Sequence, residues 1–415
     1  MTRDALPRGW SHRTLSELAA QSAYPIGDGD HGAIKPSTYQ KHGIPYIRVA
    51  DIVHDEIVNS QMAYIPEDVH MANPKSRLLP GDIVIAKTGA TIGKVAIIPE
   101  SIREANTTSS VGKVTLDPAK ADARYVYRFM QSPAFKAQMW RVSSKTAQPG
   151  FNIENLKVFK IPIPETVEQQ KYIAKILDEA DALRVKCQAA LAQLDTLTQS
   201  IFFEMFGDPA IPTRTVGQLL ESGALLSHKD GNHGSLYPRA DDFGDEGIPF
   251  VSAKAVSDDG AIDDGLVENL REERANRLKI GWISKGDVLL AHNASVGKVA
   301  LYDGRFERAL IGTSLTAFRP NPEALDSNYL AAALRARAFQ RQLEKNMGQT
   351  TRNQVPITAQ RDLKVGLPRI ELQRKFAQKA VAVEALRVSH RAAEAQFRAL
   401  FASLQQRAFG GGLVS

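Results

Sequence analysis

The chain of 415 residues is 43% hydrophobic and 24% charged, which is enough for two or three domains with cores of their own and argues against wholesale disorder. Its net charge of +6 suits a polyanionic partner without identifying one. The single cysteine, Cys187, excludes an internal disulfide, and no run of about 18 apolar residues predicts a membrane span, so the expected location is the cytoplasm.

Short motifs in the first half of the chain occur a second time, in the same order, 202 to 205 residues further on. The matching stretches are 28–32 with 230–234, 43–47 with 247–251, 81–84 with 286–289, and 93–96 with 297–300. This spacing is far longer than the roughly 20–50 residues of a solenoid repeat, so we expect each copy to be a whole domain with its connector. The sequence therefore predicts a tandem duplication.

Within each copy, short β-rich runs alternate with glycine and proline turns. In the first copy the runs lie at 44–49, 83–86, 94–98 and 113–116. A helical stretch follows at about 121–142, interrupted at Pro133, and its counterpart in the second copy lies at about 327–347. Each copy is therefore predicted to be a mixed α+β globule, with its strand order left open.

A long helix is predicted to follow each globule. Residues 167–205 and 371–407 contain neither proline nor glycine, and apolar residues recur along both at spacings of three and four, as in a coiled coil. The predicted seam of the first helix consists of Ile173, Ile176, Ala180, Leu183, Cys187, Ala190, Leu194, Leu197 and Ile201. The predicted seam of the second helix consists of Phe376, Ala380, Val383, Leu386, His390, Ala393, Phe397, Leu400 and Leu404. We expect the two helices to pair antiparallel and to hold the globules apart at a fixed distance.

These elements define the predicted fold class and its limits. The fold class is α+β, a tandem duplication of two mixed α/β globules separated by two long antiparallel coiled-coil helices. The predicted limits are 1–165 and 208–368 for the globules, and 166–207 and 369–415 for the helical regions.

Motifs that suggest chemistry each lack a required residue. Residues 89–94 approach a phosphate-binding loop, yet only three residues separate the glycines, and Val95 follows the lysine where serine or threonine is needed. The polar turns at 28–32 and 230–234 approach a calcium loop, but their glycine is fifth rather than sixth. The histidine in each turn stands without a cluster of further metal ligands. We therefore predict neither catalytic residues nor a metal site on this chain.

Several local patterns, in order along the whole chain, resemble one known family. They are the opening Leu6, Pro7, Gly9 and Trp10; the run 79–84 followed by Gly89 and Gly93; 161–164 with Glu168, Gln169 and Gln170; and 206–209. The second copy departs from the pattern at 367–373 and 409–411. The set is similar to that of the specificity subunits of type I restriction-modification systems, which alternate two target-recognition domains with two long helical regions.

The resemblance implies a function in DNA recognition, with no catalysis on this chain. Each recognition domain would read a few base pairs of double-stranded DNA, so the target would have two parts separated by an unread gap. The helices would set that gap and dock two adenine-specific methyltransferase subunits, which restriction endonuclease subunits that translocate DNA would join. The chain itself would hold no cofactor, whereas its partners would use S-adenosylmethionine, ATP and Mg.

Other functions stay open on the residues alone. One is the specificity subunit of a fused restriction-methylation enzyme. Another is an enzyme whose active site shows no motif. A third is a protein-binding scaffold with no role on DNA, which a salt-dependent DNA titration would separate from a DNA reader.

The residues expected to touch DNA lie in two loops of each copy, because Arg, Lys, Asn and Gln side chains on loops match the edges of bases. The loop some way before each long helix contains Ser144, Lys145, Thr146, Gln148 and Asn152 in the first copy, and Gln349, Thr351, Arg352, Asn353 and Gln354 in the second. The turn of the central hairpin and the lysine after it supply Lys87, Thr88, Thr91 and Lys94 in the first copy, and His292, Asn293, Ser295 and Lys298 in the second. The alternative for each is a solvated loop residue.

Overall fold

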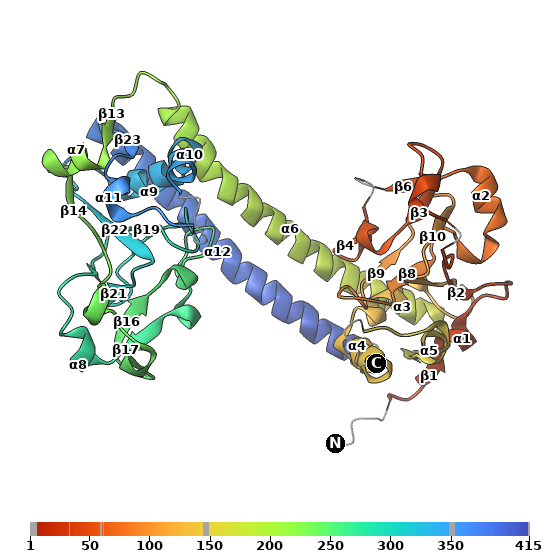
Figure 1. Cartoon of the computed structure of the whole chain (residues 1–415). Coiled ribbons are helices and arrows are strands. Elements are labelled where there is room, and N and C mark those ends of the chain that lie inside the picture. Colours follow the sequence, from red (N-terminus) through yellow and green to blue (C-terminus); the bar gives the residue numbers. More distant parts are fainter. Residues whose placement is uncertain are drawn as a thin grey trace. The chain divides into compact units, whose positions relative to one another are not determined.

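A computed structural model of the chain describes residues 6–32, 34–58, 60, 62–143, 149–347 and 353–413 (Figure 1). The chain divides into two compact units. The first unit comprises Met1–Lys186 with Glu394–Ser415, and the second comprises Cys187–Ala393. Among the described residues, no helix is both long and apolar enough to cross a membrane.

The first unit is built on two four-stranded sheets, with strand orders β2-β11-β8-β9 and β6-β3-β10-β7. Their strands are β2 (Ile26–Asp28), β3 (Ile44–Ile47), β6 (Ala63–Ile65), β7 (Arg77–Leu78), β8 (Ile83–Ala86), β9 (Val95–Ile97), β10 (Ala105–Thr107) and β11 (Val111–Val114). Two smaller pairs are β1 (Ser11–Thr14) with β12 (Lys160–Ile163), and β4 (Ile52–Val53) with β5 (Glu56–Ile57). The short helices are α1 (Leu15–Leu18), α2 (Glu67–Ala72), α3 (Ala123–Met130), α4 (Pro133–Val142) and α5 (Ile153–Val158).

The second unit is built on a four-stranded sheet, β14-β22-β19-β20, and a five-stranded sheet, β15-β17-β16-β21-β18. Their strands are β14 (Leu225–Asp230), β15 (Phe243–Gly244), β16 (Ile248–Val251), β17 (Glu268–Leu270), β18 (Trp282–Ile283), β19 (Val288–Ala291), β20 (Val299–Leu301), β21 (Ala309–Ile311) and β22 (Leu315–Pro320). A smaller pair is β13 (Thr213–Thr215) with β23 (Lys364–Gly366). The short helices are α7 (Val216–Glu221), α8 (Glu272–Ala275), α9 (Ser327–Arg335), α10 (Arg337–Asn346) and α11 (Ile357–Gln360).

The two units repeat one topology, which confirms the predicted duplication. In each unit a parallel strand pair, β3 with β10 or β16 with β21, joins antiparallel neighbours. The register repeats as well, because Gly112 lies opposite Asp28 and Thr316 lies opposite Asp230. The central strands β8 and β19 are buried along their whole length, as their unbroken apolar runs require.

Equivalent glutamines fasten each long helix to the unit where it begins. Gln170 accepts a hydrogen bond from the backbone N–H of Asp122 (2.8 Å) and donates one to the carbonyl of Lys120 (3.2 Å). Gln373 accepts from the backbone N–H of Asp326 (2.9 Å). Both glutamine side chains are almost fully buried, so these bonds are shielded from water. The second copy therefore keeps the glutamine that attaches the helix, although the rest of its sequence at 367–373 departs from the family pattern.

The long helices are α6 (Val167–Phe206) and α12 (Ile370–Phe409), close to their predicted limits. In the second unit they run antiparallel, as predicted. Cys187 Sγ donates to the carbonyl oxygen of His390 (3.3 Å), while the ring centroids of Phe206 and Phe376 lie 5.6 Å apart. In the first unit the end of α12 enters the core, where Phe409 contacts the ring of Phe129 at 5.0 Å.

The seam of the long helices differs from the prediction at four leucines. Leu183, Leu197, Leu386 and Leu400 are 48, 41, 52 and 48% exposed. The prediction is wrong there because spacings of three and four leave the choice between adjacent residues open. Next to two of these leucines, the following residue is an arginine that is less exposed than the leucine. Arg184 binds Asp181 (2.7 Å), and Arg387 binds Asp259 (3.1 Å). Among the other predicted seam residues, the buried ones include Ile173, Phe376 and Val383, and the half-buried ones include Ile176, Leu194 and Phe397.

In each unit, ion pairs join the globule to the long helix that follows it. The globule supplies the base in the first unit and the acid in the second. In the first unit Arg128 of α3, which is 5% exposed, binds Asp178 (2.7 Å) and Asp181 (2.9 Å) on α6. In the second unit the globule supplies the acid, Asp259, which binds Arg387 (3.1 Å) and Arg391 on α12. The two units therefore attach the long helix at different positions as well as with opposite charges.

Candidate nucleic-acid interface

In the first unit, the two loops predicted to touch DNA lie side by side. The backbone N–H of Phe151 donates to the carbonyl of Lys87 (3.1 Å), and that of Gly89 donates to the carbonyl of Pro149 (3.0 Å). The turn between β8 and β9 is therefore paired with the segment that leads into α5. Of the predicted residues, Ser144, Lys145, Thr146 and Gln148 lie outside the described part of the chain.

The second unit makes the same contact. The backbone N–H of Val355 donates to the carbonyl of His292 (2.9 Å), and that of Ala294 donates to the carbonyl of Asn353 (3.3 Å). A β-bridge also joins Asn293 to Gln354. Two loops that are about 60 residues apart in sequence form one composite surface in each unit. The predicted residues Gln349, Thr351 and Arg352 lie outside the described part of the chain.

Two of the predicted DNA contacts are buried beneath this surface. Lys87 is 5% exposed, and its Nζ lies 2.5 Å from Asp28 Oδ2. His292 is 2% exposed, and its Nδ1 lies 2.8 Å from Thr316 Oγ1. Burial lowers the pKa of His292, which favours the neutral ring. Both residues directly follow a buried central strand, and their side chains turn inward. The prediction that they touch DNA is therefore wrong.

The lysines that follow the turn are engaged within their own unit. Lys94 Nζ donates to the carbonyl of Ile52 (3.4 Å), and Lys298 Nζ donates to that of Val256 (3.2 Å). Lys298 also pairs with Asp258 (3.1 Å). Because equivalent lysines make the same backbone contact in both units, we assign them to the fold, in place of the DNA contacts expected from the sequence.

The remaining predicted residues differ in how far they reach solvent. Thr88 is exposed, and Thr91, Asn293 and Ser295 are half-buried. Asn152 is exposed but caps α5, because its side chain accepts from the backbone N–H of Asn155 (2.8 Å). Asn353 and Gln354 are exposed beside the turn that holds Asn293.

A pocket of about 540 Å³ opens on the composite surface of the second unit. Asn293 and Asn353 line it, together with residues that the sequence analysis missed: Tyr237, Phe250, Ser252, Thr313 and Ser314. The residues that line the pocket come from five separate segments and share no motif. Only the pairing of β16 with β21, and of the turn with the loop before α11, brings them together.

In the polar turns at 28–32 and 230–234, aspartate side chains accept hydrogen bonds from nearby groups in or next to the same turn. Asp30 accepts from the backbone N–H groups of Gly32 (3.1 Å) and Ile34 (2.9 Å). In the second unit, His233 Nε2 lies 2.7 Å from Asp230 Oδ2. Among the residues that the structure describes, no group of three or more His, Cys, Asp or Glu side chains could hold a metal ion.

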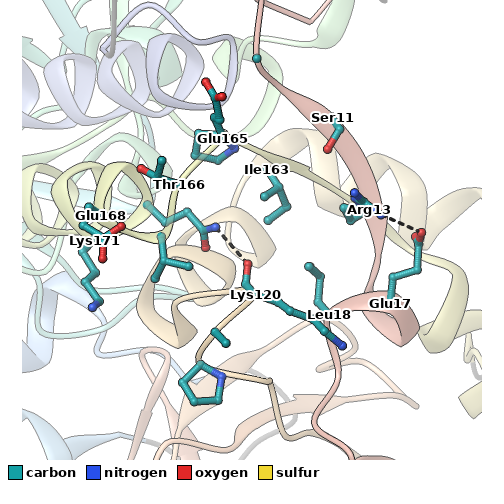
Figure 2. A pocket seen from close by; sticks show the side chains of 16 residues that line it. Ser11, Arg13, Glu17, Leu18, Lys120, Ile163, Glu165, Thr166, Glu168 and Lys171 are labelled. Atoms are coloured by element: carbon teal, nitrogen blue, oxygen red, sulfur yellow. Dashed lines mark hydrogen bonds and ion pairs between the residues drawn. The ribbon is translucent and has the colours of Figure 1, made fainter.

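A second pocket, of about 710 Å³, lies in the first unit where α6 begins (Figure 2). Its charged lining residues are balanced in sign: Arg13, Lys120 and Lys171 with Glu17, Glu165 and Glu168. Figure 2 also shows the Arg13–Glu17 ion pair at one side of the pocket. Because the charges are balanced, this pocket offers no net attraction to a polyanion, and we assign it no role in DNA binding.

Comparison with known proteins relates the chain to one family. The model of the type I restriction modification DNA specificity domain matches residues 7–193 and 232–385. The chain is 25% identical over 215 residues to the type I restriction enzyme EcoBI specificity subunit of Escherichia coli. That match covers 48% of this chain and 42% of the relative, which is less than half of the relative's length.

Two further similarities extend over nearly the whole chain. The chain is 23% identical over 399 residues to a Methanocaldococcus jannaschii protein named as the MjaX specificity subunit of a type I restriction enzyme, covering 92% of this chain and 88% of that one. The crystal structure of a type I restriction-modification system S subunit from M. genitalium superposes with a TM-score of 0.59 at 16% identity, covering 99% and 98% of the two chains. At that identity the structural match shows a shared fold.

Proposed function

The chain belongs to the family of type I restriction-modification DNA specificity proteins, and from this premise we propose that it reads a two-part target on double-stranded DNA. The observation that carries the proposal is a single scaffold present twice, with different residues where its two loops meet. Thr88 and Pro149 occupy that surface in the first unit, and Asn293 and Asn353 occupy the equivalent positions in the second. Two similar surfaces with different hydrogen-bonding groups suit two different half-sites.

We further propose that the long helices dock two methyltransferase subunits. Exposed apolar side chains recur at equivalent positions of α6 and α12: Leu183, Val185 and Leu197 on the first, and Leu386, Val388 and Leu400 on the second. Large apolar side chains that stay exposed in this way are typical of surfaces that bind another protein. Because the set occurs twice, it supports two copies of one partner, each meeting the same residues.

In this proposal the chain supplies recognition and its partners supply the chemistry. The methyltransferase subunits would bring S-adenosylmethionine to an adenine of each half-site, and restriction endonuclease subunits would bring ATP and Mg. The complex would act in the cytoplasm, where the DNA lies. The spacing of the two half-sites would follow from the helical pair, since linked readers gain affinity only on a target that matches their span.

The experiment that tests this function is a DNA titration of the complex of this chain with its methyltransferase subunits, repeated at several salt concentrations. We expect sequence-selective binding whose affinity falls steeply with salt, with a slope of about −0.9 per phosphate contacted. A complex that assembles but shows no DNA binding at low salt would leave the chain as a protein scaffold and contradict the proposal.

A further inference from the structure

The pocket of about 540 Å³ in the second unit is polar but carries no charged side chain among the described residues that line it. Among the described residues that line it, the side chains are neutral: one tyrosine, two serines, one threonine and two asparagines, with Phe250, Ala294 and Gly312 completing the wall. A site that holds phosphate normally offers lysine or arginine. A neutral lining rich in hydroxyl and amide groups is suited to the edges of bases, which present donors and acceptors without charge.

Several of these polar groups have no hydrogen-bond partner among the residues that the structure describes. Ser252 Oγ is buried and makes no hydrogen bond to any described residue. The structure likewise gives no hydrogen bond to the side chains of Asn293, Asn353 and Thr313 among the described residues, whereas Ser314 Oγ accepts from the backbone N–H of Ala253 (3.0 Å). A buried polar atom without a partner costs about 1–3 kcal/mol, so such a group is expected where a ligand completes its bonding.

The backbone of the pocket is also shaped to keep it open. Ala294 adopts a left-handed conformation (φ 63°), which turns the chain sharply beside Asn293. At Gly312, a Cβ atom would lie 3.1 Å from the ring of Phe250 and would occupy pocket space. The equivalent position in the first unit is Thr108, so the two units differ in this cavity as well as in its polar groups.

We propose that this pocket reads bases of the half-site bound by the second unit, and that the amide of Asn293 hydrogen-bonds an adenine there. This inference rests on the proposed function. An asparagine amide offers one donor and one acceptor, which match N7 and the N6 amino group of adenine in the major groove. Ser252, Thr313 and Asn353 add hydrogen bonds to neighbouring atoms, and the hydroxyl of Ser252 gains a partner that no described residue provides.

The test is an affinity measurement with the assembled complex and a set of duplexes in which each base pair of both half-sites is replaced in turn. Asn293→Asp keeps the shape of the side chain but replaces the amide donor with a carboxylate oxygen. We expect the affinity for the original target to fall about 5- to 150-fold, and discrimination to be lost at one adenine of one half-site. The other half-site should be read as before.

Asn346→Asp is the matched control, because it makes the same chemical change on an exposed residue of α10 outside the pocket. It should change affinity less than twofold. If Asn293→Asp weakens every duplex equally, or leaves the pattern of discrimination unchanged, the pocket proposal is overturned while the proposed function stands. If the unmodified complex shows no two-part selectivity at all, the proposed function itself fails.

Two serines separate recognition from folding. Ser252→Ala removes a hydroxyl that has no partner in the described part of the chain, so the unfolding temperature should not fall, whereas affinity for the original target should drop about 2- to 10-fold. Ser314→Ala removes an acceptor for the backbone of Ala253 and should lower the unfolding temperature. If Ser252→Ala changes stability and leaves affinity unchanged, the hydroxyl serves the fold and the pocket proposal is contradicted.

Discussion

The two units keep one backbone but bury their polar groups in different places. In the second unit, four buried side chains form a chain of contacts: His228 Nε2 to Gln360 Oε1 (3.1 Å), Gln360 Nε2 to Thr316 Oγ1 (3.1 Å), and Thr316 to His292 (2.8 Å). The equivalent positions in the first unit hold Ile26, Leu156, Gly112 and Lys87. There the apolar residues pack together, and Lys87 pairs with Asp28.

In the sheet that contains β10 or β21, the polar core belongs to the first unit and the apolar core to the second. In the first unit Asn106 is fully buried, contacts His70, and donates to Ser76 Oγ (2.6 Å) and the carbonyl of Asn73 (3.0 Å). The second unit has Leu310 at the position of Asn106, packed with Ala275 and Leu278. The comparison teaches that the duplicated backbone accepts either kind of core, provided that each polar group is satisfied locally. Core residues that hydrogen-bond to one another should therefore be exchangeable between the units only when they are exchanged together.

The largest effect is expected from breaking the ion pair that only the first unit contains. Lys87→Met leaves Asp28 in a mostly buried position without its cation, so we expect the first unit to lose about 3–5 kcal/mol. His292→Met at the equivalent position removes a neutral partner and should cost the second unit only about 1–2 kcal/mol. Hydrogen exchange of β11 and β22 measures each unit separately. Equal losses would show that the two cores are not different in kind.

The loss of stability as the pH falls from 7 to 4.5 should be larger in the second unit. Burial lowers the pKa of His228 from 6.5 to about 4. The unfolded chain therefore binds a proton below pH 6.5 that the folded unit does not take up until about pH 4. Stability is complete above pH 6.5, falls through this window by about 3 kcal/mol, and levels off below it.

Hydrogen exchange at pH 7, 5.5 and 4.5 checks this difference, because Ile26 occupies the equivalent position in the first unit. The double variant His228→Ile with Gln360→Leu introduces the residues of the first unit and should flatten the response of the second. A first unit that loses as much stability as the second over this range would contradict the assignment to His228.

The same two residues test whether cores exchange only as sets. Gln360→Leu alone leaves His228 and Thr316 each without a hydrogen-bond partner that Gln360 now provides. We expect this single variant to cost about 2 kcal/mol, and the added change His228→Ile to recover about 1 kcal/mol of it. Urea unfolding of the single and double variants gives the coupling energy. Strictly additive losses would show that the two positions are independent.

The smallest effect concerns the turn where the two loops meet. Ala294 has φ 63°, whereas Gly89 has φ 80° at the equivalent position. Ala294→Gly should stabilise the second unit by about 0.5–1 kcal/mol, and Gly89→Ala should destabilise the first by about 1 kcal/mol, because only glycine adopts this conformation without strain. Thermal unfolding of both variants checks the opposite signs, and effects of the same sign would refute this explanation.

The fold could largely be predicted from the sequence because its signals are periodic or repeated. The duplicated motifs indicate two equivalent globules, and the spacing of apolar residues locates α6 and α12 to within a few residues. The precise seam could not be predicted, since Leu386 is exposed while its neighbour Arg387 is buried and paired with Asp259. A hydrophobic pattern cannot show that an arginine is buried by a pairing with a distant aspartate.

The candidate site could be predicted only in part. The structure brings the turn and the loop before each long helix together, as one surface requires, yet Lys87 and His292 face the core, because the direction of a side chain at the end of a strand depends on the sheet. Ser252 and Thr313 could not be found, since they reach the pocket only through strand pairing over about 60 residues. Gln170 stood out through family resemblance alone, and its hydrogen bonds to the backbone appear only in the structure.

The central claim, that this chain reads DNA with two separate surfaces, is tested most directly by mapping adenine methylation in cells that carry it with its methyltransferase. We predict a two-part motif that is methylated only when the chain is present. Exchanging residues 210–365 for the corresponding stretch of another specificity subunit should change one half of the motif and leave the other. Methylation that is unchanged when the chain is deleted would contradict the claim.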